Sequence, residues 1–446
     1  MTVQRLIQRY GREYLRTHPL LPRRKQDVLK DLAACQTGAF GTHTLRCANC
    51  GYHAERPNSC RNRHCAQCGG SRRAEWLEQI ESQLLPTSYL QVVFTLPHEL
   101  IPVVLRHPKE LYHLLFRAAW DTLRTLAADP QHLGAKLGAL AVLHTWNQEL
   151  QAHPHVHFVV PAGGVSRDGE RWVSCHRRKG KHGKPGGYYL FPHKVISRLF
   201  RGKFLAGLRR LVREGALKLE DLPPSWQTPE KCRQRLRELY GQEWVVYQEA
   251  PPPNLEPAAL VKYLARYVSG SAIHDRRLVS EADGRVSFTV KNRQTGAQET
   301  RQVSITDFLS RYLLHVLPVG LTRIRYYGWW SPRCAAQREQ ARQLCEAAAT
   351  DTPRPAQPAV PPSAPTQDVP AKRMKCPSCS EYQVTVLASV PFSRCLVRWL
   401  PLVTARPTRP GLQTGPAGLR RVETNSPDPP SVSIAGGQCV GPEVAQ

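Results

Sequence analysis

Two short motifs carry side chains that could act together on a phosphate ester. In the run H-P-H-V-H, which predicts a strand, His155 and His157 share one face while Val156 points to the core, because successive side chains of a strand alternate. Tyr263 and Tyr267 lie four residues apart in a predicted helix, so they also share a face. Two imidazoles can hold a divalent metal ion, and a phenol can attack phosphorus when such an ion polarises the phosphate. The two pairs together predict breakage and rejoining of a DNA strand.

A third metal ligand is expected on the neighbouring strand. Residues 138–147 and 155–161 are rich in apolar and β-branched side chains, and they predict two strands joined by a loop. If that loop is centred just after Leu150, His144 lies directly opposite His157, with the two Cβ atoms about 5 Å apart. His144 is therefore the expected third ligand.

Two other residues remain alternatives for this ligand, because a slip of one residue would turn His144 to the opposite face of the sheet. They are Gln148 and His153. The site should keep an open coordination position for a phosphate oxygen, and Mg²⁺ or Mn²⁺ is the expected catalytic ion.

The tyrosine helix is expected over 256–269, with Pro257 near its start and Gly270 after its end. On their own, the two tyrosines would indicate ordinary packing of an amphipathic helix, and the histidine pair is what favours catalysis. Two phenols allow two successive transfers, in which one holds a cleaved 5′ phosphate while the other attacks a second junction. Lys262 and Arg266 lie beside them and could bind DNA by stabilising phosphate charge.

Closely spaced cysteines near the N-terminus predict a structural Zn²⁺ site. Four of them form two C-x2-C pairs separated by 14 residues: Cys47, Cys50, Cys65 and Cys68. This spacing is typical of sites in which four thiolates close a tetrahedron around zinc and fold a region too small to fold alone. Cys60 and His64 lie just before the second pair, so either could replace a ligand or orient one, and Cys60 is included in the expected set.

The chain is strongly basic. Its 62 Lys and Arg residues against 35 Asp and Glu residues give a net charge of +27, which predicts a polyanionic partner, with nucleic acid as the leading candidate. Four arginines surround the cysteine pairs and are expected to contact phosphates: Arg61, Arg63, Arg72 and Arg73.

Three regions differ in composition and pattern. Residues 1–88 predict helices around the cysteines, as in a small zinc-binding, DNA-binding domain. Residues 89–349 mix helices and strands without a regular alternation, which indicates an α+β catalytic domain with an antiparallel sheet backed by helices. Residues 350–446 begin with a proline-rich linker and continue as a tail in which little fixed structure is expected. Further predicted elements are strands at 89–96, 243–248 and 321–326, a hairpin around Asp283-Gly284, and helices at 108–128, 192–213 and 305–316.

The sequence predicts a cytoplasmic protein. It contains no run of about 18 apolar residues that could span a bilayer, and charged side chains stand where a signal peptide needs an apolar core. Cysteines at metal-ligand spacing also fit a reducing compartment. The basic charge adds the expectation of association with DNA, so the expected location is the cytoplasm at the bacterial nucleoid.

Several sequence blocks occur in an order that resembles a known family. Besides the cysteine module they are V-V-F-T-L-P-H-E-L (92–100), L-H-T-W-N-Q (143–148), H-P-H-V-H (153–157), V-P-A-G-G (160–164) and Y-L-A-R-Y (263–267). The chain resembles the HUH transposases of the insertion sequence 91 family, two-tyrosine enzymes that move DNA by a rolling-circle route through single strands. The resemblance implies a metal-dependent nick, a 5′-phosphotyrosine intermediate and a free 3′ hydroxyl. It also implies that His155 and His157 bind the metal and that Tyr263 and Tyr267 are the nucleophiles.

The chain departs from the family pattern in its last part. Cys376-x2-Cys379 begins a terminal knuckle that the following sequence does not complete, and the tail after about residue 380 looks unlike the family. Two other functions are alternatives. A replication initiator or conjugative relaxase would apply the same chemistry at a plasmid origin, whereas a zinc-dependent DNA-binding protein would carry out none.

Overall fold

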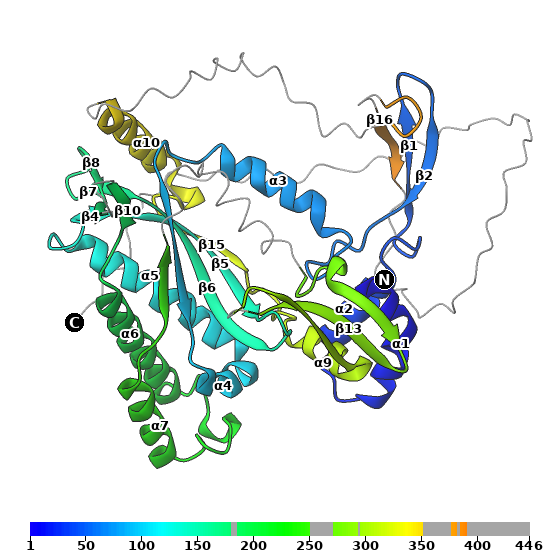
Figure 1. Cartoon of the computed structure of the whole chain (residues 1–446), viewed down its shortest axis with the longest axis horizontal. Coiled ribbons are helices and arrows are strands. Elements are labelled where there is room, and N and C mark those ends of the chain that lie inside the picture. The colour runs from blue at the N-terminus through cyan, green and yellow to red at the C-terminus, as the bar shows by residue number, and fades with distance from the viewer. Residues whose placement is uncertain (180–184, 250–270, 293–294, 351–375, 381–383, 390–446) are drawn as a thin grey trace, which may run out of the picture. The chain divides into compact units, whose positions relative to one another are not determined.

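The computed structural model describes residues 1–179, 185–249, 271–292, 295–350, 376–380 and 384–389 (Figure 1). Its helices are α1 (Val3–Thr17), α2 (Arg23–Ala33), α3 (Gly69–Glu81), α4 (Ile101–Arg106), α5 (Pro108–Ala128), α6 (His193–Arg213), α7 (Pro229–Gly241), α9 (Ile305–Leu314) and α10 (Ala335–Thr350). The longer strands are β1 (Thr42–Cys47), β2 (His53–Pro57), β3 (Tyr89–Thr95), β5 (Gly138–Trp146), β6 (Ala152–Pro161), β11 (Val246–Glu249), β12 (Leu278–Ala282), β13 (Arg285–Lys291), β14 (Gln298–Ser304), β15 (Ile324–Gly328) and β16 (Val384–Ser389). Short strands complete the set: β4 (Ala135–Lys136), β7 (Gly163–Ser166), β8 (Trp172–Ser174), β9 (His176–Lys179) and β10 (Pro185–Tyr189).

The central sheet has five strands in the order β11-β3-β6-β5-β15, and every neighbouring pair is antiparallel. The histidine strand β6 is therefore in the middle of the sheet. One face of β6 is apolar: Val156 and Phe158 are fully buried in a core that includes side chains of α5 and α6. Phe94 of β3 joins this core, with its ring centroid 4.9 Å from that of Phe200 on α6. The period-2 pattern of the sequence thus decides which face of the sheet the helices cover.

The other face of the sheet is shared between apolar and polar side chains. Val159 of β6 and Leu140 of β5 are buried in a second core with side chains of α3 and α10, among them Ile80 and Ala341. Further along the same two strands, this face carries histidines instead of apolar residues. Since a strand offers one ladder of side chains to each face, the histidines are held by the same rigid backbone that holds the core.

A second sheet, β12-β13-β14, packs against α9, and α9 in turn contacts α1. Phe288 of β13 and Phe308 of α9 are both fully buried, with ring centroids 6.1 Å apart. The Tyr10 hydroxyl of α1 donates to the Glu281 carboxylate of β12. The two N-terminal helices are thereby fixed to elements that lie more than two hundred residues later in the chain.

The α+β class, with an antiparallel sheet backed by helices and a small cysteine-rich N-terminal module, is confirmed. The predicted strands and helices of the central region are present, except that the tyrosine helix lies outside the described residues. The expectation of little fixed structure after residue 350 is wrong for one segment. There β16 pairs antiparallel with β1, with Cys47 opposite Val384, because β1 offers a free edge to the returning chain. The proposed domain boundaries at 88 and 349 stay a prediction.

Within the described residues, no helix is long and apolar enough to cross a bilayer.

Candidate active site

Three histidines from two adjacent strands converge on one face of the central sheet. His144 of β5 and His155 and His157 of β6 each offer a ring nitrogen, and these nitrogens lie within 4.8 Å of one another. His144 Nδ1 lies 3.2 Å from His155 Nε2. Three imidazoles at this spacing can share one ion and leave its remaining positions for oxygen ligands.

The register between the two strands differs from the sequence prediction. His144 lies opposite His155, and it is Val142 that lies opposite His157, so the predicted His144–His157 pair is wrong. The strands pair two residues out of the expected register because the connecting loop is centred one residue earlier, with Leu150 in the left-handed conformation at φ 61°. A shift of two residues returns a side chain to the same face of a sheet, so His144 still joins the cluster.

The histidine cluster is partly withdrawn from water. His144 is 3% exposed and His157 is 7% exposed, whereas His155 is half-buried. Burial lowers the pKa of His157 to about 4, and burial together with the neighbouring histidines lowers the pKa of His144 well below its usual value. Both rings are therefore neutral at pH 7, which is the form of imidazole that binds metal ions.

Hydrogen bonds orient the two rings of β6. The Nδ1–H of His155 donates to the carbonyl oxygen of His153 at 2.6 Å, which leaves Nε2 to face the cluster. The side-chain nitrogen Nε2 of Gln91 on β3 lies 2.6 Å from Nδ1 of His157. A metal ion at Nε2 of His157 requires that this amide turn over and present its oxygen to the ring, so that Nδ1–H becomes the donor. Gln91 is thus a positioning residue that the sequence motifs did not reveal.

The two alternative third ligands lie outside the cluster. The side-chain oxygen of Gln148 accepts a hydrogen bond from the main-chain N–H of Lys291 at 2.5 Å, in β13. His153 contributes its carbonyl to His155, and its ring is not part of the three-nitrogen group. Among the described residues, the group is therefore His144, His155 and His157.

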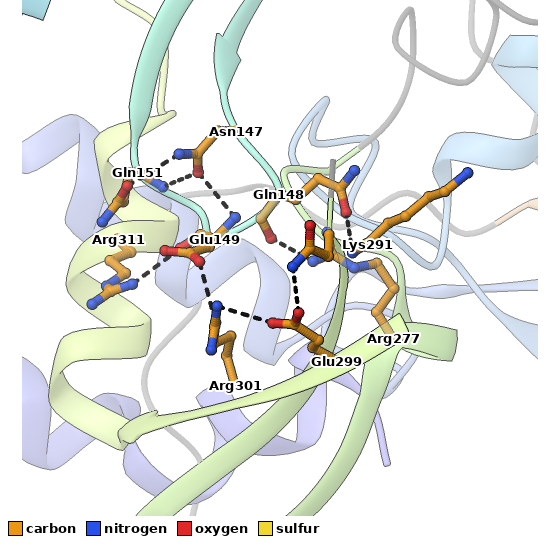
Figure 2. Close-up of polar contacts among 10 residues, drawn as sticks. Asn147, Gln148, Glu149, Gln151, Arg277, Lys291, Glu299, Arg301 and Arg311 are labelled. Atoms are coloured by element: carbon orange, nitrogen blue, oxygen red, sulfur yellow. Dashed lines mark hydrogen bonds and ion pairs between the residues drawn. The ribbon is translucent and has the colours of Figure 1, made fainter. Parts of the chain in front are cut away.

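Three arginines contact the loop that joins β5 to β6: Arg277 just before β12, Arg301 in β14 and Arg311 in α9 (Figure 2). Arg277 donates to the carbonyl oxygen of Gln148 and, at 2.8 Å, to that of Thr289. Arg311 donates to the carbonyl oxygen of Glu149 at 3.1 Å, and Arg301 pairs with the Glu149 carboxylate at 3.2 Å. These contacts fix the register of the hairpin, on which the positions of all three histidines depend.

Replacing Arg277 with alanine is expected to loosen this hairpin. Burial lowers the pKa of Arg277, and the substitution leaves two carbonyl groups without their charged donor, which costs about 2 kcal/mol of stability. Metal affinity should fall about tenfold, as for other groups that orient ligands without touching the ion. Urea unfolding and Mn²⁺ titration measure the two effects. The matched control is Arg276→Ala, which changes an exposed neighbour. Equal stability and equal Mn²⁺ affinity of the two variants would contradict the role of Arg277 in holding the hairpin.

A buried histidine also ties α9 to the hairpin. The Nε2–H of His315 donates to the carbonyl oxygen of Leu150 at 3.0 Å, and the Thr145 hydroxyl lies 3.2 Å from Nδ1 and can donate to it. Burial is the main cause that lowers the pKa of His315 to about 4. The ring is thus held in its neutral form.

This lowered pKa predicts a pH dependence of stability. Between pH 6.5 and 4 the unfolded chain binds a proton at residue 315 and the folded chain does not, so about 3 kcal/mol is lost as pH falls through this window. The His315→Asn variant should show a pH slope of unfolding smaller by about one proton. Urea unfolding at pH 7 and pH 5 measures it. The exposed His193→Asn variant should keep the slope of the wild type, and an unchanged slope in His315→Asn would refute the assignment.

The cysteines form two clusters rather than the single expected site. One contains Cys35, Cys60, Cys65 and Cys68, and the other contains Cys47, Cys50, Cys376 and Cys379. The two C-x2-C pairs near the N-terminus therefore do not meet, and the prediction that they close one tetrahedron is wrong. The reason is that Cys47 ends β1 and Cys50 lies in the turn of the β1–β2 hairpin, whereas Cys65 and Cys68 lie in the loop before α3 and group with other cysteines.

The geometry of the first cluster suits a tetrahedral metal ion. Sγ of Cys60 lies 3.6 Å from that of Cys68, and Sγ of Cys65 lies 3.6 Å from that of Cys35. Four sulfurs at 2.3 Å from zinc would be about 3.8 Å apart. Cys60 is thus in the group, as expected. Cys35, at the end of α2, was missed because it belongs to no C-x2-C pair, and His64 is buried outside the group.

Comparisons with known proteins identify the family. Residues 138–338 match a family described as "Putative transposase", and residues 6–96 match the "Transposase zinc-binding domain" of insertion sequence 91. A protein of Sinorhizobium fredii with the same transposase description, y4qJ, is 42% identical over 76% of this chain and 83% of its own length. The transposase of insertion sequence IS801 from Pseudomonas savastanoi pv. phaseolicola is 27% identical over 70% of this chain and 71% of its own length. The chain belongs to the insertion sequence 91 family of transposases.

Solved structures similar to this transposase include the conjugative relaxase TrwC in complex with oriT DNA. It is 14% identical, over 41% of the transposase and 70% of the relaxase chain, with a TM-score of 0.15. A second complex of TrwC, with mutant oriT DNA, is 15% identical with the same TM-score.

The expected nucleophiles of the transposase lie outside the described residues. Tyr263 and Tyr267 belong to the stretch 250–270, together with Lys262 and Arg266, so the structure does not place them relative to the histidine cluster.

The arginines near the cysteines that are expected to contact phosphates have different surroundings in the structure. Arg63 of the transposase donates to the carbonyl oxygens of Leu321 and Pro318, at 2.6 and 3.1 Å, and burial lowers its pKa. Its side chain therefore stabilises the fold, and the prediction that it contacts DNA is not supported. Arg61 is exposed and Arg73 is half-buried, and both stay predictions together with Arg72.

Proposed function

We propose that the transposase nicks and rejoins single-stranded DNA at the ends of a mobile element through a 5′-phosphotyrosine intermediate, as in rolling-circle transposition. The observation that carries this proposal is the histidine cluster, in which ring nitrogens of His144, His155 and His157 lie within 4.8 Å of one another. Three imidazoles on one face of a sheet can share a divalent ion, and such an ion in a DNA transposase would support cleavage of phosphodiesters.

The donor set fits a divalent ion. Imidazole nitrogens suit Mn²⁺ better than Mg²⁺, which prefers oxygen ligands, so Mn²⁺ should support the higher activity of the two. When bound, the ion supplies Lewis acidity at the scissile phosphate. The proposed role of the three histidines is to hold it in one place, and that of Gln91 and the carbonyl of His153 is to fix the ring orientations.

The proposed nucleophiles are Tyr263 and Tyr267. Attack by one phenol on phosphorus forms the P–O bond to tyrosine, breaks the bond to the 3′ oxygen of the preceding nucleotide and leaves that oxygen as a hydroxyl. Attack by a free 3′ hydroxyl on the phosphotyrosine reverses these steps and rejoins a strand. Lys262 and Arg266 are proposed to neutralise phosphate charge, and exposed Arg61 with Arg73 is proposed to bind DNA outside the site.

An adduct assay tests the proposal. The transposase is incubated with Mn²⁺ and labelled single-stranded DNA from an element end, and covalent protein–DNA products are separated on a denaturing gel. The wild type should form an adduct, and the Tyr263→Phe, Tyr267→Phe double variant should form none. The matched control is Tyr240→Phe, which removes an exposed hydroxyl from α7 and should leave the adduct unchanged.

The outcomes also separate the alternatives. Binding of DNA with no adduct in the wild type would favour a zinc-dependent DNA-binding protein. An adduct that forms on a plasmid origin but never on element ends would favour a replication initiator or relaxase. Transfer of one element end to a second strand, lost when either tyrosine is changed, would support two successive transfers.

A further inference from the structure

Four cysteines from two segments more than three hundred residues apart form the second cluster: Cys47, Cys50, Cys376 and Cys379. Sγ of Cys47 lies 3.7 Å from that of Cys379, and Sγ of Cys50 lies 3.6 Å from that of Cys376. Each sulfur of one segment thus has a close partner in the other segment. These separations match the edge of a tetrahedron of sulfurs around zinc, about 3.8 Å when the zinc–sulfur distance is 2.3 Å.

The two C-x2-C segments have the same local conformation. In each, the residue after the second cysteine is left-handed, with φ 71° at Gly51 and φ 64° at Ser380. In each, a main-chain N–H closes the turn onto the carbonyl of the first cysteine: Gly51 to Cys47 at 3.1 Å and Ser380 to Cys376 at 2.9 Å. A left-handed serine is uncommon and costs about 1 kcal/mol or more, so its presence indicates a local constraint.

The surroundings favour a closed structural site. Cys47 is fully buried and Cys376 is 1% exposed, and both pack with Leu45 and Tyr52 of the N-terminal hairpin region. The N–H of Ser378 also points to Sγ of Cys376, at 3.4 Å, as a donor to a thiolate would. Cys379 is half-buried and Cys50 is exposed, so the site is closed on one side. Four thiolates at these separations would repel one another without a cation between them.

We infer a second structural Zn²⁺ site, formed by Cys47, Cys50, Cys376 and Cys379, that fastens the segment after residue 375 to the N-terminal zinc-binding domain. The matched zinc-binding family segment, 6–96, contains only half of these ligands. The pair Cys376 and Cys379, which the following sequence leaves incomplete, is completed by residues more than three hundred positions earlier. The β1–β16 pairing starts beside this site and is held in register by it.

Zinc content of the full-length protein tests the inference. Wild type and the Cys376→Ala, Cys379→Ala double variant are dialysed against metal-free buffer and analysed by inductively coupled plasma mass spectrometry. The double variant should contain one zinc ion fewer per chain than the wild type. The matched control is Cys232→Ala, which removes a buried cysteine of α7 outside both clusters and should keep the wild-type zinc content. Equal zinc content in the double variant and the wild type would overturn the inference.

A rescue variant distinguishes loss of a zinc ligand from misfolding as the cause of a lower zinc content. Histidine can replace cysteine as a zinc ligand, so Cys379→His should retain the second ion while Cys379→Ala loses it. Cobalt substitution gives a readout that depends on thiolate ligands: the thiolate-to-metal absorption of Cys376→Ala, Cys379→Ala should fall to about half that of the wild type, since four of eight thiolates lose their ion. Recovery of the four cysteines as two disulfides in freshly purified protein would overturn the zinc assignment. Neither readout depends on DNA cleavage.

Discussion

The His157→Ala transposase is expected to lose metal-dependent cleavage of single-stranded DNA by about a thousand-fold or more. Polarisation of the phosphate by an ion is worth several kcal/mol in the transition state, and each 1.36 kcal/mol is a factor of ten in rate. His157 is expected to be an essential ligand of this ion. It lies on the middle strand, its ring is neutral at pH 7, and its ring centroid is 4.2 Å from that of His144. Single-turnover cleavage with Mn²⁺ measures the loss.

Two controls separate loss of metal from loss of fold. His193→Ala removes an exposed histidine at the start of α6 and should cleave at the wild-type rate. Metal titration followed by tryptophan fluorescence should show weaker Mn²⁺ binding by His157→Ala, while its urea unfolding at pH 7 changes by only about 1 to 2 kcal/mol. A variant that cleaves normally and still depends on Mn²⁺ would show that the ion is bound elsewhere.

The Cys65→Ala transposase is expected to lose one zinc ion and the folded state of its N-terminal helices. Cys65 is 2% exposed in the cluster that joins the end of α2 to the start of α3. Structural zinc contributes about 10 kcal/mol or more in small domains, which is comparable to the whole stability of a typical domain. Hydrogen exchange should therefore show α1 and α2 unprotected in the variant and protected in the wild type.

The matched control is Cys345→Ala, because this buried cysteine of α10 belongs to neither cluster. Its replacement removes one buried sulfur and should cost about 1 to 2 kcal/mol, with no change in zinc content or in the protection of α1 and α2. If Cys65→Ala behaved like Cys345→Ala in both measurements, the first cluster would not be a metal site.

Local patterns predicted the histidine face of the sheet well. The alternation around Val156 settles which side chains of β6 share a face, and no tertiary information is needed for that. The residue opposite His144 was harder to predict, because strand register depends on where the connecting loop turns. The turn uses Leu150 in a left-handed conformation, which leucine rarely adopts. His144 still lies on the same face as His155 and His157 because the error was two residues rather than one, and its role as the third ligand stays a prediction.

Long-range contacts explain what the sequence could not predict. Cys35 lies outside any metal-ligand spacing, and only the packing of α2 against the Cys60–Cys68 loop brings its sulfur to the cluster. Cys376 and Cys379 find their partners across most of the chain, which spacing rules cannot detect because they compare neighbours in sequence. Arg63 lies in a basic run, yet its guanidinium donates hydrogen bonds to main-chain carbonyls of a loop far away in the sequence.

The joint action of the histidine and tyrosine pairs is tested most directly by identifying the residue to which the DNA becomes covalently attached. The wild-type adduct formed with Mn²⁺ is digested with nuclease and trypsin, and the modified peptide is identified by mass spectrometry. Trypsin cuts after Lys262 and Arg266, so it separates Tyr263 and Tyr267 into different peptides. The prediction is a nucleotide 5′ phosphate on one of these two tyrosines, absent when His155 and His157 are alanine. A nucleotide on any other residue, or cleavage with no nucleotide on the protein, would contradict it.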